Sequence, residues 1–214
     1  LSNTNSPLLR KLSSEAPGTF QHDMHVADLC EEALFAIGGN MLLARTGAMY
    51  HDIGKVKNPL FFTENQHGKY NLHEDMSYYE SSQIIINHVI DGIEICRKYH
   101  LPEQIIDFVR THHGTRRTEY FYQMELRENP GEEINEADFR YHGPIPFSKE
   151  TAVLMMADSV EAASRSLQDK TEESISKLVD GIIDAQTKDN QFINTDLTFR
   201  DITTIKKVFK KKLM

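Results

Sequence analysis

Side chains of the kinds that bind metal ions recur along the sequence inside stretches that are otherwise apolar. From the N-terminus their order is His, His-Asp, His, His-His and Asp. Burying so many titratable groups without partners would cost several kcal/mol for each group. Gathering them around metal ions removes that cost, because neutral imidazole and ionised carboxylate are good ligands. We therefore predict one metal centre that collects His22, His51, Asp52, His88, His112, His113 and Asp158.

The adjacent pair His51-Asp52 indicates more than one ion. Neighbouring side chains on a helix project about 100° apart, so the two can address neighbouring sites, and a carboxylate can bridge two cations. A lone His-Asp pair or a lone buried His occurs by chance, whereas the ordered set of seven is much harder to obtain that way. We predict two divalent metal ions. Iron or manganese suits a set of imidazoles and carboxylates without thiolate, with zinc or cobalt as alternatives.

Polar residues close to these ligands have two interpretations each. His25 follows His22 by three residues and is either a surface histidine or one that supports a ligand. Glu161 and Arg165 share a helix face with Asp158, where they either support that ligand or form an i,i+4 salt bridge. Arg165 is also a candidate for binding substrate.

Three further residues are candidates for substrate contacts. Lys55 follows His51 by one helical turn and is a candidate catalytic residue that holds a phosphate oxygen while negative charge develops. The alternative is a surface lysine at a helix C-terminus, where the helix dipole favours a cation. Arg140 and Tyr141 lie in a long loop and either touch the phosphate or base of a substrate or pack that loop.

The elements that must position these residues are predicted to be helices. Apolar residues recur at helical spacing, glycines and prolines separate the stretches, and no run alternates convincingly as a strand does. We expect an all-α class and a single compact domain over 1–214, with a linker and short helix at 1–17 and a long loop at 129–147. The expected helices cover 19–37, 41–53, 77–87, 90–99, 102–113, 119–127, 149–167, 172–186 and 197–213, with a kink possible between the third and fourth.

The composition excludes several classes of protein. With 214 residues, 39% of them hydrophobic and 26% charged, the chain suits a soluble globular domain. No apolar run reaches the roughly 18 residues of a membrane span, and 1–7 lacks the features of a signal peptide. The net charge of −8 argues against a nucleic-acid polymer as partner, although a metal cluster can still attract a small anion. Cys30 and Cys96 fit reduced core residues.

Longer stretches of the sequence carry a resemblance to a known family. They are EAPGTFQH (15–22), LLARTGAMYHDIGK (42–55), FTENQ (62–66), HHGT (112–115), YFY (120–122), FRYHGP (139–144) and ADSVEAA (157–163). Together they resemble the HD superfamily of metal-dependent phosphohydrolases. More narrowly, they resemble the HD domain of the seven-transmembrane-HD receptors, the PgpH-type cyclic di-AMP phosphodiesterases. The resemblance covers nearly the whole chain and includes long loops as well as ligands.

The resemblance implies how the ligands divide between two ions that share Asp52. It assigns to one ion His22, His51, Asp52 and Asp158, and to the other Asp52, His88, His112 and His113. Relatives with three ions use a Glu one turn before the first histidine, where this chain has Gly18, so two ions are favoured. The implied activity is hydrolysis of cyclic di-AMP to linear pApA, with Asp52 and Lys55 as catalytic residues.

The sequence departs from the family pattern in three places. Leu72 and Glu74 stand in a stretch that usually reads Asn-Pro-His-Asp, and His142 stands where proline is common. The Gly-Tyr-Pro signature that some relatives cleaving cyclic di-GMP carry does not follow His113. Two alternatives stay open: an HD hydrolase of another nucleotide (cyclic di-GMP, (p)ppGpp or a deoxynucleotide), and a non-catalytic nucleotide-binding sensor domain.

The start of the sequence also carries an expectation. The chain begins at Leu1 without a methionine, and we expect it to be a piece of something longer. Family analogy implies membrane helices before Leu1 and a cytoplasmic location for this domain.

Overall fold

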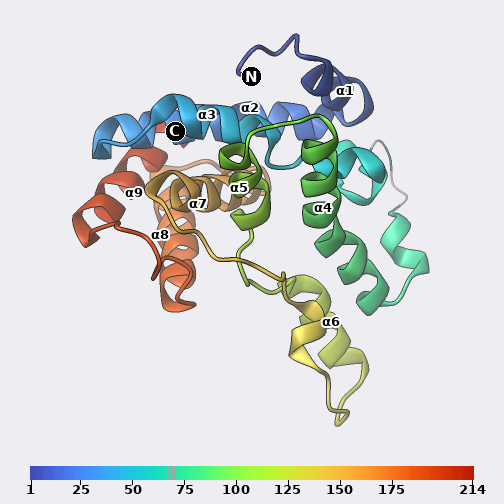
Figure 1. Ribbon diagram of the computed structural model, residues 1–214. Coiled ribbons are helices and arrows are strands. Elements are labelled where there is room, and N and C mark those ends of the chain that lie inside the picture. The colour runs from blue at the N-terminus through green and yellow to red at the C-terminus, as the bar shows by residue number, and fades with distance from the viewer. Residues whose placement is uncertain (67, 69–70) are drawn as a thin grey trace.

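The computed structural model describes residues 1–66, 68 and 71–214 (Figure 1). Within these residues the regular elements are α-helices and short 3-10 helices, so the expected all-α class is confirmed. The α-helices are α1 (Pro7–Glu15), α2 (Pro17–Ile37), α3 (Met41–Tyr50), α4 (Tyr78–Lys98), α5 (Glu103–Thr111), α6 (Glu119–Glu128), α7 (Lys149–Ser164), α8 (Glu172–Lys188) and α9 (Phe199–Leu213). The 3-10 helices are η1 (Ile53–Lys57), η2 (Pro59–Phe61), η3 (Thr63–Asn65), η4 (Leu72–Asp75) and η5 (Glu136–Phe139).

The ends of the helices follow local sequence signals. Gly38 ends α2 with a positive φ of 76°, a conformation that glycine adopts without steric cost. Asn40 then caps α3 by accepting a hydrogen bond from the backbone N–H of Leu43. Ser77 begins α4 with a capping box in which Glu80 returns the hydrogen bond. These signals fix where the ligand-bearing helices start.

Several expected helix boundaries are wrong, and two of them affect the site. The stretches 77–87 and 90–99, expected as two helices, form one continuous helix, α4, from Tyr78 to Lys98, which contains no proline to break it. The helix expected over 41–53 ends earlier, at Tyr50, and the chain tightens into η1. His51 is consequently the C-cap of α3, and Asp52 lies between two helices rather than within one.

The tight approach of η1 to α4 depends on glycine. A Cβ atom added to Gly54 would lie 1.8 Å from the carbonyl oxygen of His88. Gly92 faces the same contact, and a Cβ atom there would lie 2.8 Å from the Val109 side chain. Glycine at these positions lets the backbone after Asp52 lie against the backbone of α4, which brings Asp52 near His88.

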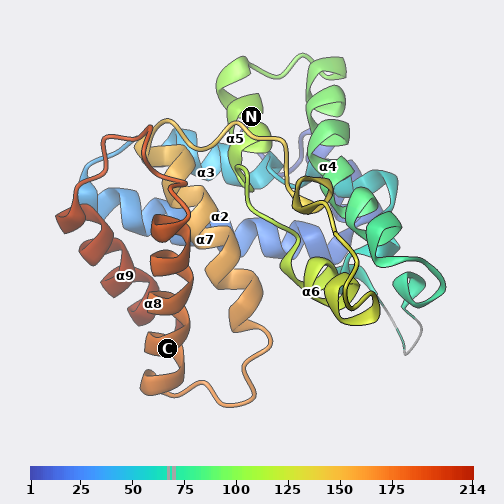
Figure 2. The same cartoon turned by 90° about the horizontal axis from the view of Figure 1, so that it is seen from below.

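The hydrophobic core surrounds α2 and α7. Buried residues of α2 such as Val26 and Leu34 pack with Met155 of α7 and with residues from the neighbouring helices. In the two views α8 and α9 lie at one end of the molecule, and α4 with α6 lies at the other (Figures 1 and 2). Among the described residues no helix is both long and apolar enough to cross a membrane.

The expected long loop after α6 is ordered by backbone pairing. Thr118 donates its N–H to the carbonyl of Phe139 at 2.8 Å, and Tyr141 donates to Arg116 at 2.9 Å. This pairing returns the chain toward the C-terminal end of α5, where the paired histidines lie, and thereby positions Tyr141 beside them.

Candidate metal centre

The seven ligands expected from the sequence come together in the interior of the fold. Residues after α3 and α5 meet residues within α2, α4 and α7, and all are buried except His113, whose side chain is 26% exposed. Their ligand atoms fall into overlapping groups within 4.8 Å: Asp52, His88, His112 and His113; His22, Asp23, His51 and Asp52; His51, His112 and Asp158. The first two groups share Asp52.

The two carboxylate oxygens of Asp52 face different histidines. Oδ1 lies 3.2 Å from Nε2 of His88 and 3.4 Å from Nε2 of His112. Oδ2 lies 3.5 Å from Nε2 of His51 and 3.8 Å from Nε2 of His22. This arrangement is the one that a carboxylate shared between two cations requires.

Three imidazoles are oriented by the backbone of their own helices. In each, Nδ1 lies against a carbonyl oxygen three residues earlier, and a carbonyl can only accept a hydrogen bond, so Nδ1 carries the proton. The pairs are His51 with Ala48 at 2.7 Å, His88 with Ile85 at 2.5 Å, and His112 with Val109 at 2.8 Å. Each Nε2 points into the centre and, once it carries no second proton, presents a lone pair there, as a metal ligand does.

The donor set fits metal ions. The Nε2 atoms of His88 and His112 lie 3.1 Å apart, and with both protons on Nδ1 the two lone pairs face each other. Both oxygens of Asp52 and Nε2 of His51 are buried without a hydrogen bond in the described part of the chain, although Oδ2 forms an ion pair with Lys55. Buried polar atoms are almost always hydrogen-bonded, so this cluster of atoms without a hydrogen bond fits a site that could hold cations.

Histidines on the α2 and α3 side of the centre hold protons tightly when no ion competes. Burial lowers the pKa of His22, but hydrogen bonds to Asp158 and Glu161 outweigh it and raise this pKa to about 9. Burial also lowers the pKa of His51, but the carboxylates of Asp52 and Asp23 raise it to about 10. An ion binding here must displace those protons.

The paired histidines after α5 behave in the opposite way. Burial lowers the pKa of His112. Burial, together with the repulsion that a protonated His112 would exert, holds the pKa of His113 well below its usual range. These two imidazoles are neutral and ready to ligate. The ring of His113 stacks on Tyr141 with centroids 4.2 Å apart and an angle of 20° between the planes.

Lys55 lies at the edge of the centre with 12% of its side chain exposed, so it is not a fully solvated surface lysine. Its Nζ atom lies 2.7 Å from Oδ2 of Asp52 and 2.8 Å from Oε1 of Glu64. It also lies 4.8 Å from the ring centroid of Phe62. Burial lowers the pKa of Lys55, but the two carboxylates raise it above its ordinary value, so the ammonium stays charged.

Glu161 contacts the first histidine, and Arg165 forms the ion pair with Glu161 that was one of its two interpretations. The carboxylate of Glu161 contacts Nδ1 of His22, and its other oxygen lies 3.3 Å from Nδ1 of His25. Arg165 forms the i,i+4 ion pair with Glu161 at 3.0 Å and also lies 3.0 Å from Nδ1 of His22.

Two residues beside the centre were missed by the sequence analysis. Asp23 is completely buried next to His51, and its helical spacing to the core residue Val26 was the available signal. Glu64 holds Lys55, and its signal was its place in the FTENQ stretch.

A cleft of about 680 Å³ opens over the centre. It exposes ligands from both halves of the centre at one surface. Among the residues that line it are His22, His112, His113, Asp158, Lys55, Arg116, Arg117, Tyr141 and Arg165. Arg116 and Arg117 were not expected from the sequence, and they add positive charge beside the ligands.

Arg140 and Tyr141 have different surroundings although they are adjacent. Tyr141 lines the cleft. The guanidinium of Arg140 donates to Glu136 and, at 2.8 Å, to the carbonyl of Thr115, and Arg140 is absent from the described lining of the cleft. For Arg140 the interpretation as a residue that packs the loop therefore fits these contacts better.

Comparison with known proteins agrees with the fold and the centre. The sequence model of the HD domain family matches residues 19–163, and the chain belongs to this family. It is 48% identical over 207 residues to the cyclic-di-AMP phosphodiesterase PgpH of Bacillus subtilis. This match covers 97% of this chain and 29% of that protein. It is 44% identical over 206 residues to the PgpH of Listeria monocytogenes, covering 96% and 28%. The chain thus spans less than a third of the curated relatives that it matches.

A solved structure is also similar. The crystal structure of the L. monocytogenes PgpH HD domain in complex with cyclic-di-AMP superposes with a TM-score of 0.95 at 43% identity, and covers 99% of this chain and 98% of that chain. The expected family, and the narrower resemblance to PgpH-type HD domains, are confirmed.

Proposed function

We propose that this chain is a metal-dependent phosphodiesterase that hydrolyses cyclic di-AMP to linear pApA. The observation that carries the proposal is the position of Asp52, whose two oxygens face two sets of imidazoles, and His22 and His112 from these sets line an open cleft. The similarity to PgpH of two species supports the reaction and the substrate.

Two divalent ions are part of this proposal. One would be held by His22, His51, Asp52 and Asp158, where Nε2 of His22 and Nε2 of His51 lie 2.9 Å and 3.7 Å from Oδ1 of Asp158. The other would be held by Asp52, His88, His112 and His113, whose ligand atoms lie within 4.8 Å of one another. When bound, such a pair activates water and stabilises the attacking and leaving oxygens of an in-line displacement. Iron or manganese fits a set of imidazole and carboxylate ligands that contains no thiolate.

In the proposed reaction a water oxygen forms a bond to one phosphorus of the cyclic dinucleotide. The bond from that phosphorus to the 3′-oxygen breaks, and the 3′-oxygen gains a proton. The charged Nζ of Lys55 lies at the edge of the centre, where it can bind a non-bridging phosphate oxygen. Arg116, Arg117 and Arg165 line the same cleft and can bind the second phosphate.

Turnover measured on metal-loaded protein tests the proposal. Cyclic di-AMP should be converted to pApA with a higher kcat/KM than cyclic di-GMP, and a chelator should abolish the reaction. Manganese or iron should restore it better than magnesium, because magnesium prefers an octahedral shell of oxygen ligands. Preference for another nucleotide would refute the substrate assignment. Absence of turnover with both ions bound would favour a nucleotide-binding sensor.

We also propose a location on the basis of the family resemblance. The domain would act in the cytoplasm, tethered to the plasma membrane by segments before Leu1. The length of the curated relatives, of which this chain covers 29% and 28%, leaves room for such segments. Membrane fractionation of the full-length protein, with detection by an antibody against this domain, tests the location.

A further inference from the structure

The ring of His113 is oriented by other means than the rings of the other four histidines of the centre. Three of those imidazoles lie with Nδ1 against a carbonyl oxygen three residues earlier, and the fourth, His22, contacts two carboxylates. Among the described residues His113 forms no such hydrogen bond. Its Nδ1 lies 3.9 Å from Oδ2 of Asp158, and its ring stacks on Tyr141. The direction of this ring therefore depends on the backbone of the turn that carries it.

One buried amide holds that turn from a distant part of the chain. Gln191 lies between α8 and α9 and is 1% exposed. Its Oε1 accepts a hydrogen bond from the backbone N–H of Thr115 at 3.1 Å, and its Nε2 donates to the hydroxyl of the same residue at 3.0 Å. A Cβ atom added to Gly114 would lie 2.2 Å from Oε1 of Gln191. The amide therefore packs directly against the backbone that follows His113.

Gln191 is itself fixed in place. Its backbone N–H donates to the carbonyl of Gln186 at 3.2 Å, and the next residue, Phe192, belongs to the hydrophobic core. On the other side of the turn, Arg140 donates to the carbonyl of Thr115 at 2.8 Å. The N–H and the carbonyl of Thr115 are thus bound by side chains from two segments that are far apart in the sequence.

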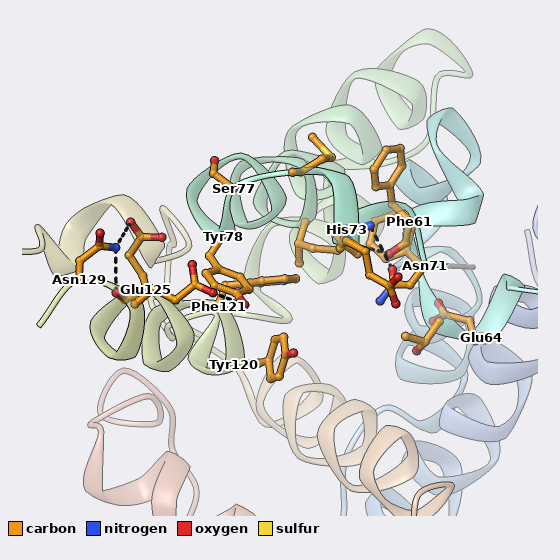
Figure 3. A pocket seen from close by; sticks show the side chains of 16 residues that line it. Phe61, Glu64, Asn71, His73, Ser77, Tyr78, Tyr120, Phe121, Glu125 and Asn129 are labelled. Carbon is orange, nitrogen blue, oxygen red and sulfur yellow. Dashed lines mark hydrogen bonds between the residues drawn. The ribbon is translucent and has the colours of Figure 1, made fainter. Parts of the chain in front are cut away.

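The helix that follows the turn gives it no comparable support. Tyr120 and Phe121 of α6 line a cavity of about 960 Å³ together with Phe61 and His73 (Figure 3). Among the described residues no hydrogen bond joins α6 to 112–115. In that part of the chain the side chains that hydrogen-bond to the backbone of 113–115 are those of Gln191 and Arg140.

We propose that Gln191 is a positioning residue for His113. By fixing the backbone of Gly114 and Thr115, its amide keeps the His113 ring stacked on Tyr141 and directed into the centre. Gln191 is absent from the described lining of the cleft, so it acts through the turn and not on a substrate. This inference rests on the proposed function, because it assigns a support to one of the two proposed metal sites.

Manganese binding tests the role without a substrate. Equilibrium dialysis of His22→Ala measures the site that contains His113, and dialysis of His113→Ala measures the other site. Gln191→Leu keeps a side chain of similar size but removes both hydrogen bonds to the turn. Added to His22→Ala, it should lower the Mn²⁺ affinity about 10- to 100-fold, the scale for groups that orient a metal ligand. Added to His113→Ala, it should change the affinity little, because the ring that it positions is absent.

Two further variants separate positioning from a general loss of stability. Val179 is buried in the core on α8, so Val179→Ala should weaken the fold in urea unfolding but leave both Mn²⁺ affinities unchanged. Thr115→Val keeps the shape of the side chain but removes the hydroxyl that accepts from Gln191. It should give a smaller loss of affinity, confined to the His22→Ala protein. If Gln191→Leu does not fold, Thr115→Val decides alone, and an unchanged affinity then contradicts the proposal.

A second measurement needs no metal ion. The rings of His113 and Tyr141 stack with centroids 4.2 Å apart, so the ring current of Tyr141 should shift the ring protons of His113 upfield. NMR of metal-free protein with labelled histidine measures this shift. Gln191→Leu should reduce it, and Tyr141→Leu gives the reference for its complete loss.

The outcomes separate this inference from the proposed function. The positioning role is refuted if Gln191→Leu leaves either the Mn²⁺ affinity of His22→Ala or the ring-proton shift of His113 unchanged. An equal loss of affinity in both proteins also refutes it, since that result indicates a general weakening of the fold. If the unaltered protein binds Mn²⁺ but does not cleave cyclic di-AMP, the proposed function fails and the positioning role stands. If it binds no Mn²⁺, the two proposed metal sites fail, and the ring-proton shift alone decides whether Gln191 positions His113.

Discussion

Asp23 lies directly behind His51, with its Oδ1 atom 3.6 Å from Nδ1 of the imidazole. Both side chains are completely buried, and neither oxygen of Asp23 has a hydrogen-bond partner among the described residues. Burial raises the pKa of Asp23 well above its usual range, although the nearby His51 opposes the shift. A buried carboxyl group without a hydrogen-bond donor is costly, so its presence beside His51 comes at the expense of stability.

We predict that Asp23→Asn stabilises the metal-free protein by about 1–3 kcal/mol at pH 8, because it removes the burial of a charge. An acid with a raised pKa in the folded state destabilises the fold progressively as pH rises above the unfolded value, near about 3.9. The gain should therefore shrink toward pH 4. Urea unfolding at pH 4.5 and 8 measures it. Asp28→Asn on the same helix, where the side chain is 52% exposed, is the control. An Asn variant that is less stable at pH 8 would contradict this account.

The bridging position of Asp52 predicts unequal effects of ligand substitutions. Asp52→Ala should remove most of both ions, because its two oxygens face both sets of histidines. His113→Ala should mainly empty one site. Elemental analysis of the purified variants gives the occupancy, with His25→Ala as a control that retains both ions. Full occupancy in Asp52→Ala would show that the carboxylate is not shared.

Acidification should empty the two sites in a definite order. The pKa values of His22 and His51, about 9 and about 10, mean that an ion must displace protons from both below pH 9. The apparent metal affinity at that site should rise by up to about a hundredfold per pH unit. The lowered pKa values of His112 and His113 predict a weaker dependence of metal affinity on pH at the other site. Equilibrium dialysis with Mn²⁺ from pH 6.5 to 8.5 tests this. His113→Ala and His22→Ala each remove a ligand from one site, so that the other site can be measured alone. An equal dependence of metal affinity on pH at both sites would contradict the prediction.

Lys55 should matter for rate more than for metal binding. Lys55→Met keeps much of the apolar stem but removes the charge that lies 2.7 Å from Asp52 and 2.8 Å from Glu64. We expect kcat for cyclic di-AMP to fall by about 10²–10³, the scale for losing one electrostatic donor to a transition state. Both ions should stay bound. Lys57→Met, at an exposed lysine paired with Asp91, is the control. A variant that loses metal but retains kcat when saturated with metal would assign Lys55 a structural role instead.

The seven residues that gather at the centre were predictable because each is a titratable residue in or next to an apolar helical stretch, and burial demands a partner for such groups. Asp23 and Glu64 were harder, because what they contact depends on which distant helices meet. Arg140 and Tyr141 show a further limit. Side chains on extended backbone point alternately to opposite sides, so adjacent residues can face a loop and a cleft, and only the register with Arg116 and Thr118 decides which.

The backbone contact between Gly54 and α4 makes the span of the metal centre a property of the main chain. Asp52 and His88 are brought together by backbone against backbone, with no room for a Cβ atom. Rotamer changes alter the distance between the Asp52 and His88 backbones little. If a larger residue replaced Gly54, substitutions of other side chains could not easily restore that distance. The same rigidity is useful to a protein engineer. Individual side chains of the centre can be exchanged while the frame that separates its two groups of ligand atoms keeps its dimensions.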